Sequence, residues 1–226
     1  MTSINSDFMS QLALRSLGKS SSMMTQAMER LSTGKRINSA ADDAAGLGIA
    51  TKLKAQVESL NAASRNTSDA LALIGTIDGA LEESQEILLR MRELAVQSAN
   101  DTVRDQDRDM LQTEVAQLEL EIQRISDDTT LSGMTLLAGG FTTGATFQIG
   151  PRAGDTIQIS IGAIDATTTV ANGGLDLNEH ISTQAGAQGY IENIDAAISV
   201  ISRDRAQYGA TMNRLDHAMA NMQNIV

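Results

Sequence analysis

Residues 53–95 read LKAQVESLNAASRNTSDALALIGTIDGALEESQEILLRMRELA, and this stretch decides the fold. Its apolar residues recur after alternating steps of four and three, the spacing that aligns side chains along one face of a coiled-coil helix. This first stripe, which has several polar interruptions, comprises Leu53, Val57, Leu60, Ser64, Thr67, Leu71, Ile74, Asp78, Leu81, Gln85, Leu88, Arg92 and Ala95. A second stripe beside it comprises Ala70, Leu73, Ile77, Ala80, Ser84, Ile87, Met91 and Leu94. Because this face is wider than a two-stranded coiled coil needs, we expect the helix to contact two or more partners.

The helix that carries these stripes would run from about residue 43 to residue 98 and be on the order of 80 Å long. Two further helices are predicted after it. Polar residues 99–109 separate the long helix from a second periodic run, Leu111, Val115, Leu118, Ile122 and Ile125, which predicts a helical hairpin. A third run comprises Ile191, Ile194, Ile198, Ile201, Arg205, Tyr208, Met212, Leu215, Met219, Met222 and Val226. Because no capping glycine or polar turn closes this run, we expect the chain to stop in mid-helix, as a fragment would.

Between the second and third helices the pattern changes to period two. Phe147 and Ile149, then Ile157, Ile159 and Ile161, predict two short strands joined by a turn over residues 150–155. Residues 162–174 are rich in Gly, Thr and Asn, and we expect a mobile surface loop or a weak third strand there. The predicted fold class is mainly α: an elongated antiparallel helical bundle or coiled-coil rod, with a small β-hairpin region between the second and third helices.

The first forty residues have a weaker helical pattern, with one apolar patch over 8–17, another over 24–31, and three serines between them. Ser39 and Asp42 match a capping box in outline, which would start the long helix near Ala40, and Gly34 makes the preceding connector flexible. We therefore divide the chain into an N-terminal segment (1–40), two rod helices (41–129), a hairpin and loop region (130–177) and a C-terminal rod helix (178–226).

The composition of the chain excludes several classes of function. The chain has 17 Lys+Arg against 28 Asp+Glu, a formal charge of −11, and only 2% aromatic residues. An acidic chain with few stacking aromatics is unsuited to nucleic acid. No stretch approaches the roughly 20 apolar residues that cross a bilayer, and no cleaved signal is visible, so we expect no membrane insertion. The absence of Cys excludes disulfides and thiolate metal sites.

No group of side chains predicts catalysis, a metal or a cofactor. His180 and His217 lie in separate segments, and neither has the i, i+4 histidine partner of a helical metal site. Adjacent carboxylates such as Asp42 and Asp43 point about 100° apart on a helix, so we interpret them as solvated. We predict a protein that is not an enzyme.

Several segments together resemble bacterial flagellin. They are LSTGKRINSAADDAAGLGI at 31–49, SLNAASRNTSDALALIGTIDGAL at 59–81 and RMRELAVQSAN at 90–100. The resemblance continues through GMTLLAGG at 133–140, FQIG at 147–150, GDTIQIS at 154–160 and IENIDAAISVISRDRAQYGATMNRLDHAMANM at 191–222. It covers almost the whole chain, in the order of the family.

The resemblance implies a structural subunit of the bacterial flagellar filament, which self-assembles through helix faces into a helical tube for swimming motility. It implies an extracellular location, type III export without a cleaved signal, and the flagellar export apparatus and the cap and junction proteins as partners. The chain resembles a compact type that lacks outer domains and is truncated before the last family helix. Without that partner helix, residues 1–38 are expected to be disordered in an isolated monomer.

The resemblance also implies recognition by the flagellin-sensing Toll-like receptor of hosts. The matching positions are Arg90, Leu94, Gln97, Glu114, Ile194 and Ile198. Leu89 departs from the family pattern, which has a polar residue there. Leu94, Ile194 and Ile198 also lie on the apolar stripes, so bundle packing is the alternative interpretation of these three.

Two other functions are compatible with heptads of this kind. A hook-filament junction protein shares the terminal design, but it should depart from the NSAADDAAG and RELAVQSAN segments, which are intact here. A chemoreceptor-type signalling hairpin also has helices rich in Ala, Ser, Gln and Glu, but it should lack the turn over residues 150–155.

Overall fold

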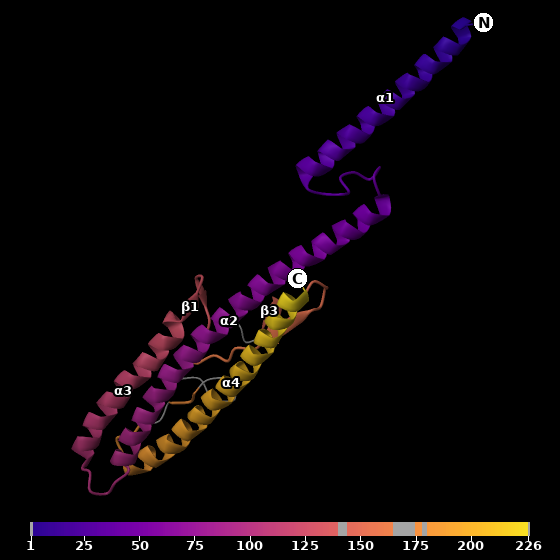
Figure 1. The fold of residues 1–226 in the computed structure, drawn as a ribbon. Helices are drawn as coiled ribbons and strands as arrows, with labels where there is room; N and C mark the ends of the chain where they lie inside the picture. The colour runs from indigo at the N-terminus through magenta and orange to yellow at the C-terminus, as the bar shows by residue number, and fades with distance from the viewer. Residues whose placement is uncertain (1, 140–143, 165–174, 178–179, 226) are drawn as a thin grey trace. The chain divides into compact units, whose positions relative to one another are not determined.

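The computed structural model describes residues 2–139, 144–164, 175–177 and 180–225 (Figure 1). In chain order its elements are α1 (Thr2–Thr33), α2 (Ala44–Ser98), α3 (Asp105–Asp128), β1 (Thr130–Leu131), β2 (Met134–Thr135), β3 (Ala145–Gln148), β4 (Thr156–Ile159) and α4 (Gln184–Ile225). They belong to two compact units, Met1–Glu58 and Ser59–Val226, and α2 begins in the first unit and ends in the second. The mainly α fold class with small antiparallel strand pairs is confirmed.

In the first unit, α1 is one uninterrupted helix rather than the two separate patches that the serines suggested. Every side chain from Phe8 to Thr33 is exposed. Gly34 follows with φ +66°, the left-handed conformation that glycine adopts without strain just after a helix end. Its role is therefore to end α1.

The long helix begins at Ala44, within one residue of the start at about residue 43 predicted from the stripes and later than the start near Ala40 that the capping-box pattern suggested. The Asp42 carboxylate accepts hydrogen bonds from the backbone N–H groups of Asn38 (3.2 Å) and Ser39 (3.1 Å), which closes a turn ahead of the helix. Asp43 then caps α2, because its Oδ1 accepts a 2.8 Å bond from the backbone N–H of Gly46. The predicted end of this helix, residue 98, is confirmed.

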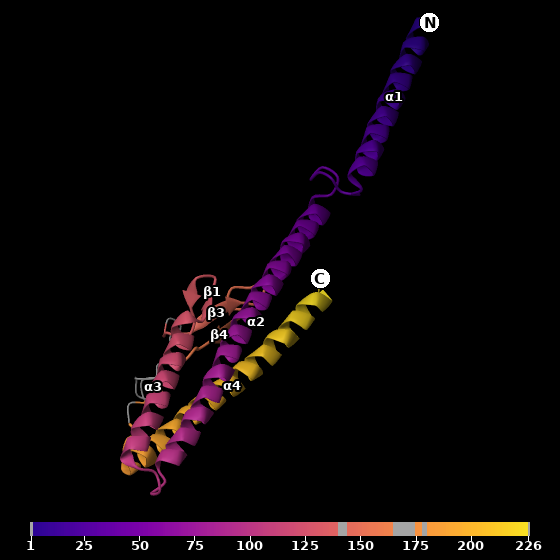
Figure 2. The same ribbon diagram turned by 90° about the vertical axis from the view of Figure 1, so that its left-hand side faces the viewer.

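In the second unit, α3 and α4 both run back along residues 59–98 of α2, as Figures 1 and 2 show from two sides. Most apolar members of both stripes are buried here, while the polar members Asp78, Gln85 and Arg92 are partly exposed. Ile74, Leu81 and Leu88 of the first stripe and Leu73, Ile77 and Met91 of the second all belong to one core. The expectation that this helix contacts more than one partner is confirmed, because apolar side chains of both α3 and α4 belong to the same core.

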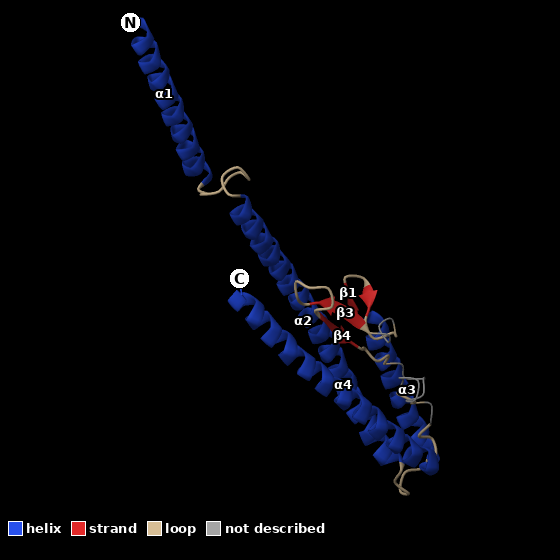
Figure 3. Ribbon diagram, turned by 90° about the vertical axis from the view of Figure 1, so that its right-hand side faces the viewer, coloured by secondary structure: helices blue, strands red, loops and turns tan. Residues whose placement is uncertain are grey.

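Two short antiparallel hairpins follow α3 and precede α4 in the chain, and Figure 3 shows them beside α2 and the C-terminal end of α3. β3 pairs with β4 in the predicted position, with Phe147 opposite Ile157. The pair β1–β2 was not predicted. It turns at Ser132 and Gly133, whose φ values of 52° and 81° match the left-handed pair of a two-residue hairpin loop. In the sequence, the only local indication of the β1–β2 hairpin is the Ser132-Gly133 dipeptide at its turn.

The core also takes in part of the segment that we expected to be a surface loop. Ile164 is buried, and its backbone N–H donates a 3.0 Å bond to the carbonyl of Leu137. Burial of the apolar Ile164 side chain is therefore favourable enough to bring this part of the segment into the core, although the surrounding sequence is polar. The rest of the expected loop, residues 165–174, lies outside the described residues.

Candidate functional site

Arg90 on α2 is the centre of an exposed charged cluster with α3. Its Nη2 lies 2.8 Å from Oε1 of Glu114, and its Nη1 lies 3.0 Å from Oε2 of Glu93. The hydrogen bond to Glu114, followed by that to Glu93, raises the pKa of the Arg90 guanidinium. The cluster therefore presents a cation that two carboxylates hold in place on an open helix surface.

The residues that the family resemblance singled out divide into two groups. Arg90, Gln97 and Glu114 are exposed, whereas Leu94 and Ile194 are buried in the core. Ile198 is partly buried and packs against that core. The structure thus favours bundle packing for Leu94 and Ile194, and it leaves three polar residues on the surface of α2 and α3.

Ion pairs join α2 to α4 at two levels. Arg92 Nε lies 2.7 Å from Asp195 Oδ1, and this hydrogen bond lowers the pKa of Asp195. Arg205 Nε lies 2.8 Å from Asp78 Oδ1, and Arg205 Nη1 donates a 3.1 Å bond to Gln85. Sequence reasoning placed Arg92, Asp78, Gln85 and Arg205 on helical stripes but predicted neither pair, because partners 103 and 127 residues apart leave no local signal.

Buried Arg108 of α3 holds the C-terminal end of α2. Its Nε donates a 2.9 Å bond to the carbonyl of Ser98, and its Nη2 donates a 3.1 Å bond to the carbonyl of Asn100. The Ser98 carbonyl is one of the last carbonyls of α2, which have no partner inside the helix, and a cation is favoured at this end of the helix dipole. The backbone N–H of Ile181 also donates a 2.6 Å bond to Gln112, which ties the chain before α4 to α3.

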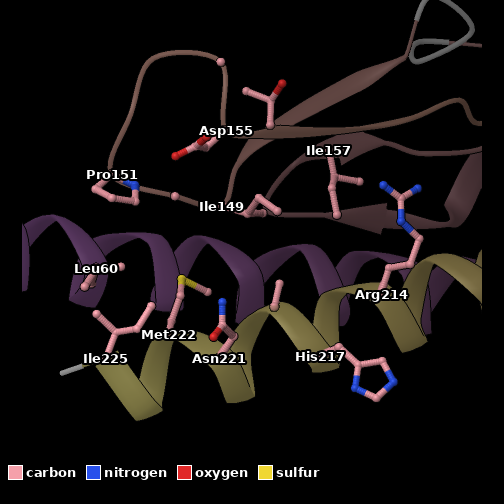
Figure 4. A pocket seen from close by; sticks show the side chains of 14 residues that line it. Leu60, Ile149, Pro151, Asp155, Ile157, Arg214, His217, Asn221, Met222 and Ile225 are labelled. Atoms are coloured by element: carbon pink, nitrogen blue, oxygen red, sulfur yellow. The ribbon is translucent and has the colours of Figure 1, made fainter.

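A shallow groove of about 540 Å³ lies between the β3–β4 turn, α2 and the last turns of α4 (Figure 4). Leu60, Ile149, Pro151, Met222 and Ile225 contribute its apolar lining. His217 and Arg214 also line it. Nothing in the described part of the chain gathers three or more His, Cys, Asp or Glu side chains that could hold a metal ion.

Most of the large apolar side chains that are exposed in the described part of the chain lie in the first unit. On α1 they are Phe8, Met9, Leu12, Leu14, Leu17, Met23, Met24, Met28 and Leu31, and on the first turns of α2 they are Ile49 and Leu53. Exposed apolar residues in such number on one helix are typical of a surface that another chain or segment covers. Among the described residues, no helix has the length and hydropathy to span a membrane.

Comparison with known proteins agrees with these features. A family model, the bacterial flagellin N-terminal helical region, matches residues 4–142. A flagellin of Halalkalibacterium halodurans is 40% identical over 222 residues, which cover 98% of this chain and 80% of that protein. The crystal structure of Bacillus cereus flagellin is similar with a TM-score of 0.60 and 36% identity, over 70% of this chain and 88% of that one.

A putative flagellar hook-associated protein from Vibrio parahaemolyticus has a TM-score of 0.69 at 16% identity, over 82% of this chain and 95% of that one, a likeness of fold alone. The family-model match and the 40% identity across nearly the whole chain decide the assignment. The chain belongs to the bacterial flagellin family.

Proposed function

We propose that this structural subunit of the flagellar filament assembles through the apolar side chains of α1 and of the first turns of α2. The observation that carries the proposal is the contrast between the two units. The second unit buries its heptad stripes in its own core, whereas α1 leaves large apolar side chains such as Phe8, Leu17 and Leu31 exposed. Burial of apolar area contributes about 25 cal/mol per Å², so neighbouring subunits that cover α1 gain a large association energy.

Seeded assembly tests this proposal. Leu17 on α1 and Leu120 on α3 are a matched pair, with exposed fractions of 69% and 63%. Leu17→Gln should slow or abolish seeded growth, measured by sedimentation and electron microscopy, while Leu120→Gln should assemble like the native chain. Equal losses in the two variants, or none in Leu17→Gln, would contradict an assembly surface on α1.

The proposal extends to the partners that the family resemblance implies. The export apparatus would deliver the subunit to the extracellular filament, and cap and junction proteins would contact its ends. The exposed residues Arg90, Gln97 and Glu114 form the proposed contact for the flagellin-sensing Toll-like receptor. Support for this contact is that Arg90 is accessible and that Glu114 and Glu93 fix its position.

Receptor recognition is tested by Arg90→Ala against Arg124→Ala. Arg124 is a suitable control because it is also an exposed arginine, paired with Glu121 and Asp128 on α3. Arg90→Ala should lower both receptor binding and reporter-cell signalling, with an unchanged unfolding midpoint, and Arg124→Ala should change neither. If the two variants signal equally, the receptor does not read Arg90.

A further inference from the structure

We infer that peroxide oxidises Met9, Met23, Met24 and Met28 of α1 in the unassembled subunit, and that oxidation of these four, rather than of the exposed methionines outside α1, blocks filament growth. The effect on growth rests on the proposed assembly role of α1. The chemical part of the inference, the order in which methionines react, does not depend on that role.

The described methionines differ widely in exposure: outside α1, Met110 (63%) and Met134 (48%) are exposed as well, and Met212 and Met219 are partly buried. The four on α1 are between 56% and 65% exposed, whereas Met91 is 0% exposed and Met222 is 5% exposed. Oxidation of a thioether requires that the oxidant reach the sulfur atom, so exposure sets the order of reaction. Because the chain has no Cys, no thiol competes for the oxidant.

The α1 methionines also lie where an added oxygen would disturb association. Met24 and Met28 continue the stripe of Leu17 and Leu31, at steps of seven, four and three residues. Met9 is two heptads before Met23, so these two share a neighbouring line. A neighbour that covers this face would have to bury each sulfoxide oxygen without a partner, which slows addition by about tenfold for each one.

The reaction balances without a further reagent. A lone pair of the thioether sulfur attacks one oxygen of hydrogen peroxide, the S–O bond forms and the O–O bond breaks. The sulfur loses two electrons, and the other peroxide oxygen leaves as water after proton transfer. Methionine sulfoxide reductases reverse the change, so the block is reversible.

Peptide mapping by mass spectrometry tests the first part, on monomer and on assembled filament treated with hydrogen peroxide. In the monomer the α1 methionines should convert to sulfoxide at least about tenfold faster than Met91 and Met222. In the filament they should be protected. Similar rates at exposed and buried positions, or equal rates in monomer and filament, would overturn the inference.

Seeded growth tests the second part. The fourfold variant M9L/M23L/M24L/M28L should grow after peroxide treatment, whereas the native chain should not. The control M110L/M134L removes two exposed methionines outside α1 and should lose growth as the native chain does. Loss of growth in the fourfold variant as complete as in the native chain would overturn the inference.

Reductase treatment of the oxidised native chain is a second measurement, which needs no variant. Recovery of growth together with reduction of the α1 sulfoxides supports the inference, and reduction without recovery overturns it. If untreated native subunits fail to grow, the proposed assembly function fails instead, and the peptide map still decides which methionines react.

Discussion

The hydroxyl of Tyr190 on α4 donates a 2.6 Å hydrogen bond to Oε1 of Glu119 on α3. Burial raises the pKa of Glu119 above its ordinary value, and the hydrogen bond from Tyr190 and the charge of His180 oppose this shift. Burial, followed by the bond to Glu119, also raises the pKa of Tyr190. The two helices thus share a polar contact at the edge of an aliphatic core.

Glu119→Gln should be more stable than the native chain at pH 7. A carboxyl with a raised pKa binds its proton more tightly in the folded state, so its contribution to stability is present at low pH. That contribution is lost as the pH rises from 4.5, the unfolded value, through the folded value. Gln keeps an acceptor for Tyr190 and removes the charge, so the advantage should vanish near pH 4.

Urea unfolding of both chains across this pH range makes the measurement. Glu119→Leu is the control, because it leaves the Tyr190 hydroxyl without an acceptor and should cost about 1–3 kcal/mol at every pH. A Gln variant as unstable as the Leu variant would contradict the assignment.

Alkaline titration should show that neither tyrosine ionises at its ordinary pH. The chain has two Tyr and no Trp, so tyrosinate absorbance near 295 nm reports them alone. Burial, followed by the charge of Asp204, raises the pKa of Tyr208 to about 12. Folded protein should therefore remain unionised through pH 10, and unfolded protein should titrate there.

Tyr190→Phe and Tyr208→Phe would assign the absorbance, since the Tyr208 signal should appear first. Because both folded values are raised, the unfolding free energy should fall as the pH rises above 10. Ionisation near pH 10 in the folded chain would refute this.

Arg205→Met should cost more stability than Arg92→Met. The Arg205 and Asp78 side chains are only 28% and 29% exposed, and Gln85 and Glu82 add further contacts. Loss of Arg205 leaves a half-buried carboxylate without its cation, which we expect to cost about 1–2 kcal/mol. Arg92 and Asp195 are more exposed, so water and salt screen them.

Denaturation at low and high salt separates the two pairs. The effect of Arg92→Met should shrink as salt is added, and that of Arg205→Met should largely persist. If both effects disappear in salt, the Arg205–Asp78 pair is as solvated as the Arg92–Asp195 pair, which would contradict the prediction.

The turn between β1 and β2 should respond in opposite directions to two small substitutions. Ser132→Asn should raise stability by a few tenths of a kcal/mol, because Asn tolerates a positive φ better than Ser. Gly133→Ala should lower it by about 1 kcal/mol, although no atom lies within 4 Å of the added Cβ, because the backbone conformation disfavours any side chain. Thermal melts of the two variants would show whether the backbone φ angle or the space around the side chain determines how substitutions at this turn change stability.

Local periodicity predicted those parts of the fold that depend on neighbours in sequence. The end of α2 at Ser98 and the two strands joined by the turn over residues 150–155 were predicted from periods of 3.5 and two, whereas the register that places Phe147 opposite Ile157 comes from the structure. The start of α2 was predicted in two ways, at about residue 43 from the stripes and near Ala40 from the capping box, because Asp43 competes with Ser39 as a cap and only the folded turn around Asp42 decides between them.

The candidate surface was predictable in part, for a similar reason. Arg90, Gln97 and Glu114, which the family resemblance singled out, lie on exposed helix positions, and their role in receptor binding stays a prediction. The packing of Leu94 and Ile194 could only be decided by the fold, because an apolar residue on a stripe suits a core or an interface equally well. Partners such as Arg92 and Asp195 are separated by 103 residues, beyond any pattern in a window of sequence.

The contacts between α2 and α4 have a consequence for the order in which the chain folds. A ribosome completes α2 at Ser98 and adds the first residue of α4 only at Gln184. Until then the stripe that contains Leu81 and Leu88 has no α4 to cover it. Because the contacting helices are so far apart in the sequence, the nascent chain exposes this stripe until α4 is made, so a holdase-type chaperone that shields it would protect the chain from aggregation.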